Sequence, residues 1–141
     1  MRLTKFSDYA LRVLMYAAVR KERLITIDEV SKVYGISRAH LMKVVNQLSR
    51  AGYLTAVRGR SGGITLAKRP NAVRLGDVVR ATEPDFALVE CFEMRNECVV
   101  TARCRLRGVL DEALSAFIRT LDRYTLADLI LNPRDFGIKQ R

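Results

Sequence analysis

The chain has 141 residues, a length that suits one domain or one domain with an attached helix. Hydrophobic residues make up 49% of the sequence, which excludes a fibrous or globally disordered protein. No stretch approaches the roughly 20 apolar residues that a membrane span requires, and charged residues occupy the N-terminal region where a signal peptide is apolar. We therefore expect a cytoplasmic protein with no membrane partner.

The charge is strongly positive and is concentrated in one part of the chain. The net charge is +10 at pH 7; residues 1–84 carry 16 Lys and Arg against 6 Asp and Glu, whereas residues 85–141 carry nine of each. Within the first part, residues 30–76 contain nine basic residues and no acidic one. A polyanion such as double-stranded DNA is therefore the expected partner.

Three consecutive helices are expected in the first half of the chain. Apolar residues at steps of three and four predict an amphipathic helix over residues 7–20. Residues 24–34 predict a second, short helix, because Thr26 and Glu29 form a capping-box pattern and Gly35 can end it. A third helix follows the tight turn at Gly35. The second and third helices then form a helix-turn-helix, in which the later helix presents polar side chains to the major groove.

The third helix has an apolar face and a polar face. Ser37 is placed to cap it, and its inward positions are apolar. Its outward positions include Arg38, His40, Lys43 and Asn46, side chains that reach base edges or phosphates in helix-turn-helix proteins. The sequence therefore predicts a recognition helix here.

A β-hairpin follows the third helix. Residues 53–57 and 63–67 are β-type runs that flank a glycine-rich tip with two arginines. Such a hairpin is a wing, and Arg58 and Arg60 on its tip suit the minor groove or the DNA backbone. The expected fold is mainly α with a small β-hairpin wing. The residues expected to bind DNA are Ser37, Arg38, His40, Lys43, Asn46, Arg58, Arg60, Ser61 and Gly62.

The second half of the chain is expected to contain two further helices, separated by a loop with the three cysteines. A short helix over residues 77–82 is expected to stop before Pro84. Residues 106–121 predict a long helix whose wide apolar face a small winged core cannot cover, so we expect it to form the seam of a homodimer. The expected organisation is a winged helix-turn-helix domain (1–84), a cysteine loop (85–104), a dimerisation helix with a C-terminal helical segment (105–131) and a frayed tail (132–141).

Three cysteines, Cys91, Cys98 and Cys104, fall in a C-x6-C-x5-C pattern before the long helix. An odd number of cysteines in a reducing compartment argues against a disulfide framework. Zinc usually takes closely spaced cysteine pairs and four ligands, whereas thiolates on a loop suit an iron-sulfur cluster with a weaker fourth ligand. Zinc and plain structural cysteines remain alternatives to the cluster.

The sequence offers little for catalysis. It has a single histidine, His40, and no Gly-rich phosphate loop, so the common nucleophile and phosphoryl-transfer arrangements are excluded. We therefore expect a binding protein and not an enzyme.

The resemblance to known proteins is carried by residues 3–12, 34–38, 46–53, 57–64, the three cysteines and residues 124–129. Together these segments resemble NsrR-like nitric-oxide-sensing repressors, which belong to a family of dimeric winged-helix regulators that also includes IscR. The resemblance implies a bacterial transcriptional repressor in which nitric oxide acts on an iron-sulfur cluster, of 4Fe-4S or 2Fe-2S type, and so releases operator DNA. The alternative is a regulator with iron-sulfur or zinc that responds to iron or redox state, or an intracellular metal- or redox-binding module.

Two positions separate the subfamilies. IscR-like proteins carry a histidine ligand three residues after the last cysteine, where this chain has Arg107. NsrR-like proteins use an aspartate near the start of the first helix, reaching from the partner subunit, and Asp8 stands at the matching place. If Ser7 caps that helix, Asp8 sits at its positive end, which favours the carboxylate. The resemblance thus implies Cys91, Cys98, Cys104 and Asp8 as cluster ligands.

Overall fold

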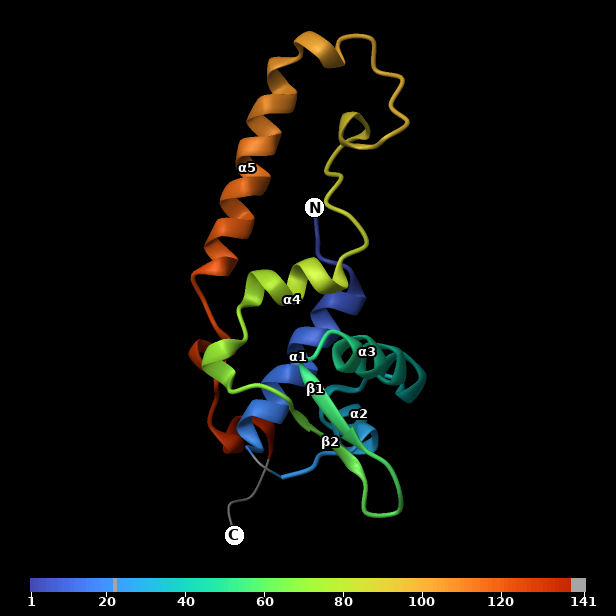
Figure 1. Cartoon of the computed structure of the whole chain (residues 1–141), viewed down its shortest axis with the longest axis vertical. Coiled ribbons are helices and arrows are strands. Elements are labelled where there is room, and N and C mark those ends of the chain that lie inside the picture. The colour runs from blue at the N-terminus through green and yellow to red at the C-terminus, as the bar shows by residue number, and fades with distance from the viewer. Residues whose placement is uncertain (22, 138–141) are drawn as a thin grey trace.

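The computed structural model describes residues 1–21 and 23–137 (Figure 1). The helices and strands are α1 (Lys5–Val19), α2 (Ile27–Tyr34), α3 (Arg38–Arg50), β1 (Leu54–Val57), β2 (Gly63–Leu66), α4 (Leu75–Thr82) and α5 (Arg105–Asp122). They confirm the expected mainly helical fold with a two-stranded wing. Each expected helix and strand is present, with boundaries displaced by three residues or fewer.

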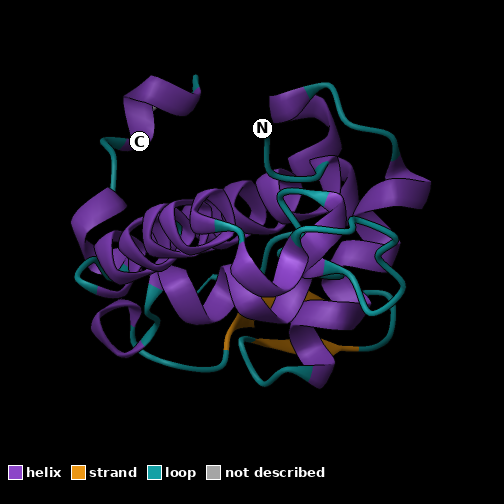
Figure 2. Ribbon diagram, turned by 90° about the horizontal axis from the view of Figure 1, so that it is seen from above, coloured by secondary structure: helices purple, strands orange, loops and turns teal. Residues whose placement is uncertain are grey.

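The core lies where α1 packs against α3 and α4. One face of each of these three helices is apolar and buried. A large apolar side chain stabilises the fold by about 1.5–3 kcal/mol when it is fully buried. Figure 2 shows the helices gathered over the small sheet. The largest members of this core include Leu14, Tyr16, Ile25, Leu41, Leu48 and Val78.

α1 is capped by Thr4, so the expectation that Ser7 caps it is wrong. The Thr4 hydroxyl accepts a hydrogen bond from the Ser7 backbone N–H (3.2 Å), and the Thr4 N–H and hydroxyl both donate to a Glu83 carboxylate oxygen (2.8 and 2.9 Å). Ser7 is fully buried one turn later, where its hydroxyl accepts from Thr82 (2.8 Å). The helix starts earlier because these contacts tie its first turn to the end of α4.

The wing is an antiparallel hairpin whose register runs from Leu54 opposite Leu66 to Val57 opposite Gly63. A further pair of backbone hydrogen bonds between Ile25 and Ile64 (2.9 and 2.8 Å) anchors the hairpin to the segment before α2. The hairpin is therefore held beside the helix-turn-helix as a fixed element.

α5 leaves the body formed by α1–α4 and the wing, and carries the cysteine loop at its far end (Figure 1). Its last turn is anchored to α4, because the Arg80 guanidinium donates two hydrogen bonds to Asp122 (2.7 and 2.6 Å). Gly76 lies against the same carboxylate, where a Cβ atom would clash. None of the residues of α5, all of which the structure describes, is buried, so its apolar face is only partly covered in the single chain.

The segment after α5 folds back onto the body. Leu126 is fully buried, and its N–H donates to the Val73 carbonyl (2.8 Å). A 3₁₀ turn, Pro133–Phe136, then packs the Phe136 ring edge-on against Tyr16 and Tyr34 at 5.6 and 6.1 Å between centroids. The expectation of a frayed tail is therefore wrong for residues 132–137, and its remainder, residues 138–141, lies outside the described residues.

In the part of the chain that the structure describes, no helix is long and apolar enough to cross a membrane.

Candidate DNA interface and cysteine loop

α3 separates its side chains as the sequence predicts. Leu41, Val44, Val45 and Leu48 are buried, whereas Arg38, His40, Lys43 and Asn46 are exposed. The Ser37 hydroxyl accepts a hydrogen bond from the His40 backbone N–H (3.3 Å) and so caps the helix, as expected. The structure thus brings five of the expected DNA-binding residues together at the N-terminal part and outer face of one helix.

The wing tip holds the other expected DNA-binding residues. Arg58, Arg60 and Ser61 are exposed, and Gly62 is half-buried. Gly59 has a φ of +111°, a backbone conformation that side chains rarely allow, and a Cβ at Gly62 would clash with the Val57 carbonyl. The glycines therefore allow a tight tip on which both arginines are exposed. Gly62 contributes by permitting this backbone conformation and has no side chain to contact DNA.

Every basic residue between positions 30 and 76 is solvent-exposed, so this charge is available to a polyanion. A nearby acidic group, Glu29, is instead engaged inside the domain. Its carboxylate accepts hydrogen bonds from the Tyr16 hydroxyl (2.8 Å) and from Arg20 (3.1 Å), and it also pairs with Arg23. The exposed basic residues of the stretch are Lys32, Arg38, Lys43, Arg50, Arg58, Arg60, Lys68, Arg69 and Arg74.

The pKa of Glu29 reflects this network. Burial alone would raise the pKa, but hydrogen bonds from Tyr16 and Arg23, together with the Thr26 N–H, outweigh burial and hold the pKa below its usual value. Glu29 therefore stays ionised and links α1 to α2, and its charge is engaged by these partners and not offered at the surface beside the basic residues.

The sequence reasoning missed two residues of the α3 surface. Met42 has 53% of its surface exposed, and Arg50 is exposed at the end of the helix. Steps of four residues connect Arg38, Met42, Asn46 and Arg50, which places them along one line of the helix. This spacing was readable in the sequence, and an exposed methionine there suits apolar contact with a thymine methyl group.

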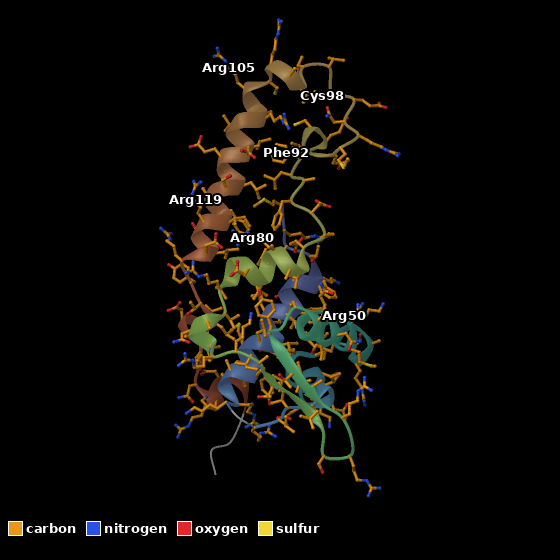
Figure 3. All side chains as sticks on the ribbon, in the orientation of Figure 1. Arg50, Arg80, Phe92, Cys98, Arg105 and Arg119 are labelled. Carbon is orange, nitrogen blue, oxygen red and sulfur yellow. The ribbon has the colours of Figure 1, made fainter. Side chains whose placement is uncertain are left out.

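The cysteines lie on one segment between α4 and α5. Cys91 sits in a 3₁₀ turn (Glu90–Phe92), Cys98 is exposed, and Cys104 directly precedes α5; all three are free thiols. Figure 3 shows Cys98 at the end of the molecule far from the wing. An open cavity of about 920 Å³ lies beside Cys104 and is also lined by Arg107.

The donor chemistry of this segment fits an iron-sulfur cluster, because accessible thiolates are the ligands that such clusters take. One chain does not assemble the site: among the described residues, no group of three or more His, Cys, Asp or Glu side chains could hold a metal ion. Asp8 lies on α1, away from the cysteine loop in sequence, where it pairs with Arg12 (2.9 Å). Its role as a ligand therefore requires the partner subunit and stays a prediction.

Comparison with known proteins identifies the family of this chain. A family model, Rrf2, described as an iron-dependent transcriptional regulator, matches residues 3–132. The chain belongs to the Rrf2 family. Its members are transcription regulators and not enzymes, which confirms the expectation of a non-enzyme; they bind DNA and typically form dimers.

Solved structures of similar proteins agree with the fold. The CymR protein of B. subtilis, described as its global cysteine regulator, is 24% identical with a TM-score of 0.73 over 92% of this chain and 95% of that one. A putative transcriptional regulator from Listeria innocua is 27% identical with a TM-score of 0.74 over 92% and 85%. IscR of T. potens is 22% identical with a TM-score of 0.72 over 100% and 94%. These neighbours differ in name, and only CymR is described by a signal, so the family alone does not identify the signal of this Rrf2 protein.

Proposed function

We propose that this Rrf2 protein is a homodimeric repressor of the NsrR-like kind, which releases operator DNA when nitric oxide reacts with an iron-sulfur cluster on its cysteine loop. The observation that carries the proposal is the placement of Cys91, Cys98 and Cys104. All are free, all lie outside the buried core, and all belong to one segment that ends at α5. Structural cysteines would instead be expected among the buried core side chains.

The uncovered face of α5 supports a dimer. Leu106 and Val109 have 63% and 61% of their surface exposed in the single chain. A second copy of α5 would cover such a face, and a twofold axis would place two α3 helices against one duplex. Two recognition helices then read half-sites about 10 base pairs, or one helical turn, apart.

Contacts within the chain connect the cysteine loop to α3. The loop joins α4 and α5, and the Arg80–Asp122 pair fixes the other end of α5 to α4. α4 in turn touches the recognition helix, because the Gln47 side-chain amide donates to the Ala81 carbonyl (3.2 Å). A change in the loop therefore has a continuous packed route to the DNA-reading surface.

When bound, the cluster supplies an iron that exchanges its weak ligand and reacts with nitric oxide. The three thiolates hold the cluster, and Asp8 of the partner subunit completes the ligand set. A ligand changes DNA affinity only by its different affinity for the two protein states, which typically amounts to about 5- to 150-fold. We expect tight operator binding by the loaded dimer and weak, mainly non-specific binding without the cluster.

The test starts from the full chain purified without oxygen. Native mass spectrometry should show a dimer with one iron-sulfur cluster per chain and should identify its type. The loaded dimer is then bound to a fluorescent duplex selected from a random pool, and nitric oxide is titrated while anisotropy is recorded. Affinity should fall as the absorbance of the cluster disappears.

Single Cys→Ser substitutions should each prevent stable cluster assembly. Met94→Ser is a matched control, since it removes a sulfur from a fully exposed position of the same loop and should leave cluster content unchanged. Unchanged operator affinity after complete loss of the cluster would refute the sensor. A colourless protein that contains zinc would favour the zinc regulator.

A further inference from the structure

The recognition helix has an acidic neighbour that the DNA-binding surface does not need for affinity. Asp28 lies in the first turn of α2, and its Oδ1 atom is 2.8 Å from Nη1 of Arg38, the first residue of α3. The pair therefore joins the N-terminal turn of α2 to the N-terminal turn of α3. Both side chains are open to solvent, with 66% of Arg38 and 51% of Asp28 exposed.

A carboxylate at this position weakens binding to any duplex, because it repels phosphates and neutralises one of the basic residues that attract them. An asparagine would suit the first turn of a helix without this repulsion. The partner of Asp28 lies on α3. Two other carboxylates of the N-terminal half have partners elsewhere, since Glu29 accepts from Tyr16 and Asp8 pairs with Arg12 on its own helix. The benefit of Asp28 must therefore lie in something other than affinity.

We propose that Asp28 is a specificity-determining residue, which positions the guanidinium of Arg38 to read a guanine and withholds it from phosphates. The guanidinium has five N–H donors, and the ion pair involves one nitrogen, so donors remain for a two-bond contact with guanine O6 and N7. A free arginine samples many rotamers and can place its charge on the DNA backbone as well as on a base edge. Holding it in one orientation lowers the entropy that reading a base costs.

This inference rests on α3 being the DNA-reading helix, and the test separates the two. The full-length dimer and its variants each select binders from a pool of random 30-base-pair duplexes, and the selected base preferences are read by sequencing. Affinity is then measured by anisotropy for the duplex that the parent selects and for a scrambled duplex. The variants are Asp28→Asn, Arg38→Ala, the double variant, and Asp77→Asn.

Asp77→Asn is the matched control. Asp77 also lies in the first turn of a helix, is 55% exposed, and pairs with an arginine of its own helix, Arg80 (3.1 Å). It therefore reports what the loss of one exposed, arginine-paired aspartate does away from α3.

We expect Asp28→Asn to lower the ratio of selected to scrambled affinity by about fivefold, while affinity for the scrambled duplex rises about twofold. The salt slope of the variant dimer should steepen by about 1.8, since each freed arginine gains a phosphate contact worth about 0.9. Guanine preference should disappear at the same position in Asp28→Asn and Arg38→Ala. In the Arg38→Ala background, Asp28→Asn should leave the ratio unchanged, and Asp77→Asn should leave it unchanged in the parent.

Two outcomes would overturn the inference while leaving DNA recognition intact. In one, the parent selects a defined sequence and Asp28→Asn selects the same sequence with the same ratio. In the other, Asp28→Asn raises both affinity and base preference, which would make the pair an inhibitory contact. A parent that selects no sequence at all would instead refute sequence-specific recognition by α3.

Discussion

The wing provides a quantitative prediction about how this Rrf2 protein holds DNA. Arg60 is exposed on a tip whose shape is set by Gly59 and Gly62, so Arg60→Ala removes a charge without disturbing packing. If Arg60 contacts a phosphate, each arginine contributes about 0.9 to the slope of log affinity against log salt. A dimer has two copies, so the slope should become shallower by about 1.8.

The magnitude follows from the exposed basic surface. A dimer that neutralises roughly 6 to 10 phosphates should have a parent slope near −5 to −9. Between 50 and 200 mM salt, a slope change of about 1.8 means that the affinity of the parent should fall by roughly 12-fold more than that of the variant. The effect should be the same on selected and scrambled duplexes, because a phosphate contact carries no sequence information.

The assay is fluorescence anisotropy over a salt series with both duplexes. Arg105→Ala is the control, since Arg105 is an exposed arginine on α5 at the end of the molecule far from the wing (Figure 3). Its slope should match that of the parent. An unchanged slope for Arg60→Ala, or an equal change for Arg105→Ala, would refute the assignment of the wing tip to the DNA backbone.

Two further predictions concern stability. Because the folded-state pKa of Glu29 is lowered, its ionised form stabilises the fold above its usual pKa of 4.5, and this contribution is lost as the pH falls through the folded value. Glu29→Gln should therefore cost about 1–2 kcal/mol of unfolding free energy at pH 7, measured by urea unfolding. This cost should shrink as the pH is lowered below 4.5, and a deficit that stays constant over that range would contradict the prediction. Phe136→Ala should cost about 1–2 kcal/mol and lower the melting temperature by several degrees, because the ring packs on Tyr16 and Tyr34. Leu131→Ala, on a side chain that is 44% exposed, should cost less than about 0.5 kcal/mol, and a parent-like Phe136→Ala would mean that this segment does not contribute to the fold.

The sequence alone determined the elements whose signals are local. The capping box of Thr26 and Glu29 starts α2, and Gly35 ends it in a left-handed conformation (φ +65°), as the pattern predicts. The same holds for the buried face of α3, the Ser37 cap and the glycine-rich wing tip. These features depend on residues a few positions apart, so their hydrogen bonds and helical spacing can be read without knowing the rest of the fold.

Only the tertiary structure decided features that join distant residues. Thr4 caps α1 because Glu83 and Thr82, more than 70 positions away, bind its first turn. The Arg80–Asp122 pair and the return of Phe136 onto the core likewise depend on how helices pack. The cysteines show the same limit: their sequence pattern predicts cluster chemistry, but the ligand set depends on loop placement and on the partner subunit. Contacts of this range are set by the burial of whole helix faces, which a local pattern does not encode.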